Sequence, residues 1–243
     1  MISYKSLKNQ ARDFLAVTGL RVDEFENLLP TFAGEYERMY PSDRRMDGQA
    51  RQRRAGAGRK ARLASSEDKL LFILTYHKQY PLQTFHALQF GMSQGRANEW
   101  IHRLSPILQA TLEQLGMAPE RQGEAVVNSE MAQAGGADLA IDGTERRRQR
   151  PGVAAQQKAH YSGKKKTHTD KNVIVTNVHS GKVVYLSGTQ AGSVHDKKVS
   201  DESGLLYPEG ATLSKDTGFQ GYEPPYSLTL QPKKAKRARV DPQ

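Results

Sequence analysis

The sequence predicts an α+β protein in which an all-α N-terminal region precedes an α/β domain. Apolar residues recur at helical spacing through most of the first 116 residues. Beyond residue 137, short β-branched runs bounded by turn residues are more typical of strands. The composition fits modest hydrophobic cores, because 37% of the 243 residues are hydrophobic and 26% are charged.

The charge balance favours a polyanionic partner. Lys and Arg number 36 against 26 Asp and Glu, which gives a formal net charge of +10, and such an excess most often marks nucleic-acid binding. Ribosome-like or merely solubilising surfaces carry the same signature. Cysteine is absent, so disulfides and Cys-based zinc sites are excluded, which suits a reducing cytosol. No stretch approaches the ~18 apolar residues of a membrane span, so we expect no membrane partner.

The first 64 residues divide into a helical region, residues 1–45, and a basic linker, residues 46–64. Residues 4–40 have helical periodicity, with a break at residues 18–20. We expect Pro30 to end one helix or to open the next. The linker can lie along DNA phosphates or be solvated chain; its cations are Arg51, Arg53, Arg54, Arg59, Lys60 and Arg62.

Residues 65–116 form a candidate helix-turn-helix. Ser65 and the acidic residue at 68 have capping-box spacing before an apolar run. A short helix follows, residues 82–90, for which we expect Phe85, Leu88 and Ala87 to face inward. A turn at Gly91 and a cap at Ser93 then introduce the third helix, residues 94–104.

The third helix of this region is the expected recognition helix. We expect its outer side chains to contact phosphates or base edges from the major groove: Gln94, Arg96, Asn98 and Arg103. Two amphipathic helices with a Gly turn also occur in ordinary bundles. Ser105-Pro106 is expected to restart a helix, and residues 117–137 are expected to be a linker between domains.

Two short strands of the second domain each lead to an aspartate. Residues 139–141 deliver Asp142 to a strand end, where Gly143 is expected to turn the chain away, and residues 211–215 lead to Asp216. Adjacent parallel strands would bring these carboxylates together as a site for two-metal phosphoryl transfer. Asp-Gly alone is also a common turn dipeptide.

Basic residues are concentrated between the two aspartates. The cations that we expect to bind a phosphate chain beside the metal are Arg146, Arg147, Arg148, Lys164, Lys165 and Lys166. A solvated basic run would have the same composition. Residues 172–178 and 182–187 predict a hairpin. Ser193, His195 and Asp196 are too close in sequence for a catalytic triad, but His195 and Asp196 can border the site.

Four blocks in this order resemble a known family. They are Ile141–Glu145, Tyr161–Lys166, Gly192–Lys197 and Lys215–Gly221, and they are similar to motifs of DDE transposases, in particular the bacterial insertion-sequence group related to Harbinger elements. The resemblance implies an RNase H-like fold with a mixed five-stranded sheet over residues 138–232, followed by a basic tail, residues 233–243.

The resemblance also implies an activity, a cofactor and partners. It implies Mg²⁺- or Mn²⁺-dependent cleavage and transfer of strands at the ends of an insertion element. The partner would be double-stranded DNA, the protein a possible homo-oligomer, and the location the nucleoid in a prokaryotic cytoplasm. Asp142 and Asp216 match the first two catalytic and metal-binding acids, while Asp196 and His195 would have supporting roles.

The sequence departs from the family in one respect. The family's third acid is a Glu on a helix well beyond the second Asp, whereas this chain has 243 − 216 = 27 residues after Asp216. We therefore expect a truncated domain with impaired cleavage. A non-catalytic DNA-binding fragment or regulator is the alternative, and an unrelated nuclease or RNA-binding protein is a third. Metal-dependent nicking distinguishes the first two.

Overall fold

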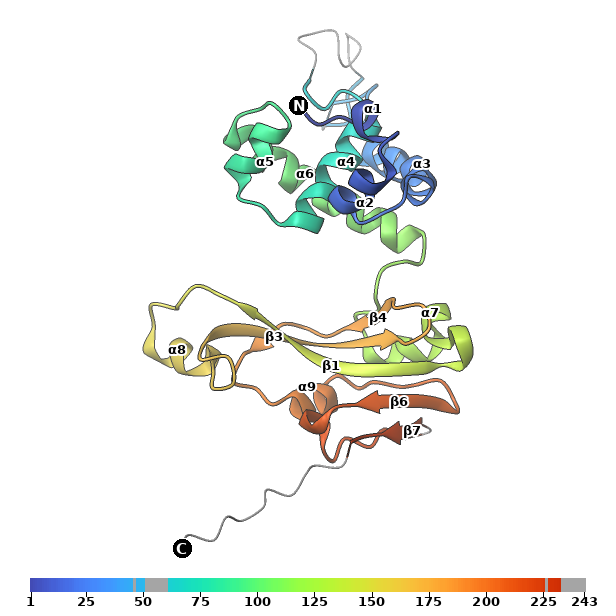
Figure 1. Ribbon diagram of the computed structural model, residues 1–243, viewed down its shortest axis with the longest axis vertical. Coiled ribbons are helices and arrows are strands. Elements are labelled where there is room, and N and C mark those ends of the chain that lie inside the picture. The colour runs from blue at the N-terminus through green and yellow to red at the C-terminus, as the bar shows by residue number, and fades with distance from the viewer. Residues whose placement is uncertain (46, 51–60, 226, 233–243) are drawn as a thin grey trace, which may run out of the picture. The chain divides into compact units, whose positions relative to one another are not determined.

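The computed structural model describes residues 1–45, 47–50, 61–225 and 227–232 (Figure 1). It comprises two compact units, Met1–Met117 and Ala118–Gln243. The cations Arg51, Arg53, Arg54, Arg59 and Lys60 of the basic linker, and the basic tail, lie outside the described residues.

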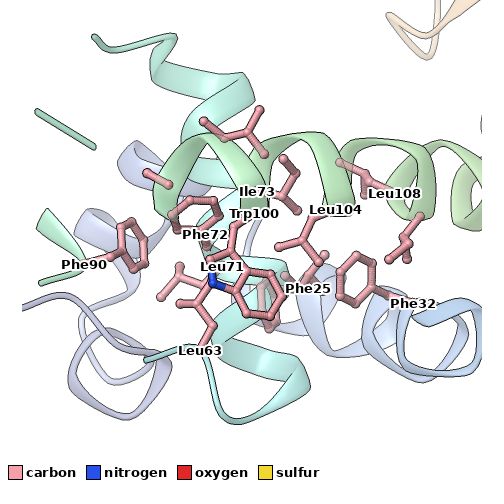
Figure 2. Close-up of a cluster of buried hydrophobic side chains, with 14 of the residues drawn as sticks. Phe25, Phe32, Leu63, Leu71, Phe72, Ile73, Phe90, Trp100, Leu104 and Leu108 are labelled. Atoms are coloured by element: carbon pink, nitrogen blue, oxygen red, sulfur yellow. The ribbon is translucent and has the colours of Figure 1, made fainter. Parts of the chain in front are cut away.

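The described part of the first unit is built of helices around one core. Its helices are α1 (Tyr4–Leu7), α2 (Ala11–Thr18), α3 (Val22–Met39), α4 (Ser66–Gln79), α5 (Gln83–Gln89) and α6 (Gln94–Gln114). Figure 2 shows side chains of α3, α4 and α6, among them Phe25, Phe72 and Leu104, packed in a single cluster. The region before the basic linker and the helices after it therefore share their hydrophobic core.

Two prolines lie inside helices of this unit. Pro30 is within α3 and Pro106 is within α6, so the expectation that each proline ends or restarts a helix is wrong. An internal proline removes one hydrogen bond and clashes with the preceding turn, at a cost of about 3 kcal/mol. Both helices bury apolar side chains on either side of the proline, and this packing outweighs the local cost.

The buried face of α5 also differs from the expected one. Phe85 and Leu88 are 57% and 71% exposed, and the residues that pack inward are His86, Ala87 and Phe90. Apolar side chains occupy both faces of this short helix, so periodicity could not choose between them. Contact with α4 decides, because the His86 ring packs 4.3 Å from the ring of Phe72.

The turn before α6 agrees with the sequence. Gly91 has a φ of 64°, in the left-handed region that favours glycine. Ser93 caps α6, and its hydroxyl accepts a hydrogen bond from the backbone N–H of Arg96. Ser65 caps α4 in the same way, accepting from the N–H of Asp68.

The second unit is built on a mixed sheet, which confirms the α+β class. Its strands are β1 (Asp138–Arg147), β2 (Tyr161–Ser162), β3 (Thr167–Asn177), β4 (Val183–Leu186), β5 (Gln190–Ala191), β6 (Ala211–Lys215) and β7 (Ser227–Leu230). β1 is antiparallel to β3 and parallel to β6, and β7 is parallel to β6. β2, β4 and β5 are each antiparallel to β3.

Short helices complete the unit. They are η1 (Gly123–Asn128), α7 (Glu130–Gln133), η2 (Ala134–Gly136), α8 (Ala154–His160), α9 (Asp196–Glu202) and η3 (Thr217–Phe219). β6 pairs with only the first four residues of β1, so β1 and β3 continue beyond it as an antiparallel arm toward α8 (Figure 1).

Residues 118–137 belong to the second unit. We expected a linker here, but Val126, Ala132 and Ala137 are buried in the core beneath the sheet. Glu120 also extends the sheet, because its N–H donates to the carbonyl of Val184 at 2.7 Å. The short 3-10 turns of this segment have no 3.6-residue repeat, and so the sequence showed no periodicity.

Burial of His86 makes the helical unit sensitive to acid. Burial lowers the pKa of this imidazole from 6.5 to about 4, so the unfolded chain binds the proton more readily. The stability contribution is complete above pH 6.5, and we expect about 3 kcal/mol to be lost as the pH falls toward 4. Chemical denaturation followed by the fluorescence of Trp100, the only Trp of the chain, will measure this loss.

The His86→Leu variant is the control for this prediction. Its stability should vary much less with pH over the same interval. A small residual slope of the same sign is expected from His77, whose pKa is also lowered by partial burial. Equal slopes in the two proteins would contradict the assignment.

Candidate active site at the ends of two parallel strands

Asp142 and Asp216 occupy equivalent positions on neighbouring strands. Ile141 of β1 is in parallel register with Lys215 of β6, and the two aspartates are the next residues along each strand. Parallel strands present their carboxyl ends at the same edge of a sheet. The structure thus brings together two acidic residues that lie 74 positions apart in the chain (216 − 142 = 74).

Both carboxylates are exposed and point one oxygen at a nearby backbone amide. Asp142 Oδ1 accepts from the N–H of Gly143 at 2.7 Å, and Asp216 Oδ1 accepts from the N–H of Gly218 at 2.8 Å. Among the described residues, neither carboxylate has an ion-pair partner. Each therefore keeps oxygen lone pairs available to a ligand from solvent.

Gly143 does not turn the chain away, contrary to the expectation. β1 continues straight through it to Arg147. A Cβ atom on Gly143 would lie 2.6 Å from the carboxyl carbon of Asp196, and one on Gly218 would lie 3.3 Å from Asp196 Oδ2. The glycines beside the two acids therefore make room for a third carboxylate, which is carried by the first residue of α9.

A buried lysine holds this third carboxylate. Lys171 on β3 has a side chain that is only 8% exposed. Its Nζ lies 3.0 Å from Asp196 Oδ1 and 3.6 Å from Glu145 Oε1, and it donates to the carbonyl of Val194 at 2.8 Å. Asp196 Oδ1 has no partner with hydrogen-bond geometry in the part of the chain that the structure describes, so this contact with Lys171 is an ion pair only.

Glu145 is the second acid bound to this lysine. Burial raises the pKa of its carboxyl, but hydrogen bonds from Ser162 and Thr169 and the charge of Lys171 outweigh burial, so the pKa lies below its usual value. The Thr169 hydroxyl donates to Glu145 Oε2 at 3.0 Å. The carboxylate is thus ionised at neutral pH and fixed within the sheet.

The donor set at the strand ends fits a hard divalent cation. Mg²⁺ is commonly held by one or two carboxylates together with water and substrate phosphates, and Asp142 and Asp216 supply two exposed carboxylates. The described part of the chain holds no group of three His, Cys, Asp or Glu side chains placed to enclose a metal ion. Two aspartates completed by water and phosphate are therefore the ligand set available here.

His195 has a marginal position. It is the exposed residue that precedes α9, and its ring makes no hydrogen bond or ion pair with any described residue. It remains next to Asp196 in the chain, at the border of the site, as the sequence predicts. No side-chain contact in the structure gives it a further role.

The candidate recognition residues on α6 fall into two groups. Gln94 and Asn98 both donate to Gln83 Oε1 on α5, at 2.7 and 3.2 Å. Exposed Arg96 pairs with Glu99 at 2.5 Å. Arg103, in contrast, has its guanidinium over the rings of Tyr40 and Trp100, at 4.9 and 5.1 Å from their centroids, and so helps to hold the helical unit together.

The basic residues of the β1–β3 arm also divide into two groups. Arg146 donates to Asn172 Oδ1 at 2.8 Å, and Arg148 pairs with Asp170 at the same distance. The side chains of the remaining four are exposed and have no partner among the described residues: Arg147, Lys164, Lys165 and Lys166. These four cations are free to contact an anionic partner.

Sequence reasoning missed Lys171 as a site residue. Of the basic residues between the two aspartates, only Arg146, Arg147, Arg148, Lys164, Lys165 and Lys166 were expected at the site, and no role was expected for Glu145. The signal in the sequence was a lysine at the start of a β-branched strand, where burial is unusual for this residue type. That signal does not identify the acids that surround it.

Comparison with known proteins gives two family matches. Residues 141–243 match a family described as "DDE superfamily endonuclease", and residues 61–114 match "Helix-turn-helix of DDE superfamily endonuclease". The chain therefore carries a helix-turn-helix region and an endonuclease region that match the DDE superfamily. The first match includes Asp142, Asp196 and Asp216, and the second covers α4, α5 and α6.

A curated relative agrees with these two matches. The chain is 23% identical over 173 residues to the "Probable transposase for insertion sequence element IS702" of Microchaete diplosiphon. The alignment covers 71% of this chain and 59% of the relative, so the chain spans less than two thirds of that protein. No solved structure matches. No helix among the described residues is long and apolar enough to cross a membrane.

Replacement of Gly143 by alanine tests the contact with Asp196. The new methyl group would overlap the Asp196 carboxylate, and we expect a loss of about 1–3 kcal/mol in the stability of the second unit. Denaturation followed by circular dichroism measures this loss, while Trp100 fluorescence reports the first unit separately.

Gly188→Ala is the matched control, because a Cβ atom there meets nothing within 4 Å. It should leave stability nearly unchanged. Equal stability of the two alanine variants would contradict the close approach of Asp196.

Proposed function

We propose that this chain is a transposase polypeptide that binds the ends of an insertion element and cuts and joins DNA strands with a divalent cation, Mg²⁺ or Mn²⁺. The observation that carries the proposal is the parallel register of β1 and β6, which places Asp142 and Asp216 side by side. The two regions that match DDE superfamily models support it.

Asp142 and Asp216 would hold the metal in this proposal. A bound divalent cation supplies a Lewis acid for the phosphate and a lowered pKa for the attacking water or hydroxyl. The two carboxylates fix its position through strands that cannot shift independently, because β1 and β6 are hydrogen-bonded up to the residue before each acid. Asp196 and His195 have supporting roles at the border of the site.

Charge around the site also favours cations. Four carboxylates gather here, those of Asp142, Glu145, Asp196 and Asp216. Within the described ranges, Lys171 is the one cation that contacts two of them. The formal balance of these five groups is −4 + 1 = −3. A surplus of negative charge at a partly exposed edge attracts divalent cations. Without a bound cation, the carboxylates repel each other.

DNA binding is assigned to α6 and to the β1–β3 arm. On α6, Arg96 is exposed and, with Gln94 and Asn98, lies in the first turns of the helix, the part that reaches base edges in a helix-turn-helix. On the arm, four exposed cations would follow the phosphate chain: Arg147, Lys164, Lys165 and Lys166. The arm begins where Asp142 ends the pairing of β1 with β6, so bound DNA would pass next to the two acids.

A non-catalytic role in DNA binding is the second candidate. It is favoured by the ligand set, because two aspartates without a third metal-binding acid among the described residues bind metal less tightly than a complete triad. In that role the protein would occupy element ends through α6 without cutting. A prokaryotic cytoplasm with association to the nucleoid, and assembly into a homo-oligomer, are compatible with either role.

Cleavage by the wild type and by Asp142→Asn and Asp216→Asn variants tests the leading proposal. We expect Mn²⁺- or Mg²⁺-dependent nicking of DNA that carries the element ends, and a loss of at least about 100-fold in each variant, because each removes one metal ligand. Gel analysis of labelled DNA measures the rates, and Asp201→Asn, a carboxylate paired with Lys197 on α9, is the control.

Absence of nicking in the wild type, with specific binding retained, would favour the non-catalytic role. Nicking that survives both substitutions would reject the assignment of the two aspartates.

Binding by Arg96→Ala and Asn98→Ala variants tests the recognition helix. Each should lose about 1–3 kcal/mol of discrimination between element ends and unrelated DNA. Fluorescence anisotropy with both DNAs measures the ratio of affinities. Gln109→Ala is the control, because this residue is exposed farther along α6 and bonds only to Glu113. Unchanged sequence preference in both variants would contradict the assignment of α6.

A further inference from the structure

We propose that Lys171 is a positioning residue for the two catalytic acids, acting through the Asp196 carboxylate. This inference rests on the proposed function, in which Asp142 and Asp216 bind a metal ion. The contact between Lys171 and Asp196 is a property of the protein without metal.

The first step is that Asp196 is next to both acid-bearing segments, residues 141–147 on β1 and residues 214–220. Its carboxylate occupies the space that a side chain at Gly143 would fill, and it is also next to Gly218. Gly143 follows Asp142 directly, and the N–H of Gly218 donates to Asp216. A shift of this one carboxylate would therefore open or close space at both metal-binding residues together.

The second step is that Asp196 is held mainly by Lys171. Nζ of this lysine ties three parts of the unit to β3: the Asp196 carboxylate on α9, the Val194 carbonyl before α9, and the Glu145 carboxylate on β1. The lysine side chain is more than nine-tenths buried. A buried ammonium needs these partners, because its desolvation is costly without them.

The third step is that the surrounding cations do not take over this role. Lys215, which immediately precedes Asp216, is buried and directs its Nζ to the Tyr222 carbonyl and to Glu223. Lys197 pairs with Asp201, and Lys198 pairs with Glu202. Among the described residues, Lys171 is thus the cation that pairs with Asp196.

Two functions of a lysine in this place predict opposite effects on metal binding. As a positioning residue it holds Asp196, and thereby both acid-bearing segments, in the geometry that binds metal, so its removal weakens binding. As a mere neutralising charge it opposes the incoming cation, so its removal strengthens binding. The sign of the change separates the two.

Hydrogen exchange without metal is the primary experiment. Lys171→Met and Asp196→Asn keep side-chain length or shape and remove the ion pair. In both variants we expect exchange in peptides covering residues 141–147 and 214–220 to be about tenfold faster, because these two acid-bearing segments open more often once the ion pair is lost. Exchange in the β3–β4 hairpin should be unchanged. Lys198→Met, which removes a surface ion pair from α9, should leave both peptides unchanged.

Mn²⁺ binding is the second measurement, followed by the electron paramagnetic resonance signal of the free ion. We expect both variants to bind about tenfold more weakly than the wild type, as is typical when a group that orients metal ligands is removed. Tighter binding by Lys171→Met would overturn the positioning role in favour of simple charge opposition.

The remaining outcomes are also decisive. Unchanged exchange in both acid-bearing segments of Asp196→Asn would reject the positioning role, even if Lys171→Met does not fold. Faster exchange throughout the second unit would reject it as well, because it would show a general structural role. If the wild type binds no Mn²⁺, the proposed metal chemistry is rejected. The exchange data would still decide whether Lys171 positions the two acid-bearing segments.

Discussion

Parallel hydrogen bonding between β1 and β6 is the constraint on which the site depends. Its register aligns Ile141 with Lys215, and from this alignment the adjacency of the two aspartates follows directly. The chain between these strands makes the antiparallel hairpin of β3 and β4 and then α9, before it returns as β6. That excursion carries Asp196 to the same edge of the sheet, so three carboxylates converge through backbone topology before any side chain is considered.

Convergence of like charges has an energetic cost that the second unit offsets locally. Carboxylates gathered at one edge repel each other, and isolated buried charges are expensive. Lys171 compensates Glu145 and Asp196 inside the sheet, and Lys215 compensates Glu223 behind β6. Asp142 and Asp216 are left at the surface without such a partner among the described residues. The uncompensated charge therefore remains where solvent, a metal ion or a phosphate can reach it.

The same division between structural and free charges holds for the basic residues. Arg103 lies over two aromatic rings, and Arg148 is paired with Asp170. Both guanidinium groups therefore interact with other residues of the fold. Arg147 and the three lysines at 164–166 are exposed and unpaired in the part of the chain that the structure describes. Composition gives the sign of the partner, but only these contacts show which cations are available to it.

The sequence by itself determined the helical and mixed-sheet regions, the caps at Ser65 and Ser93, and the two strands that lead to Asp142 and Asp216. These features depend on local spacing, turn residues and motif order, all of which lie within short windows. The tertiary structure alone decided that α3 and α6 continue through their prolines, that His86 rather than Phe85 is buried, and that β1 continues through Gly143. It also placed Lys171 against Asp196. In each case the deciding partner is distant in sequence, and packing or charge burial against that partner outweighs a local preference worth only a few kcal/mol.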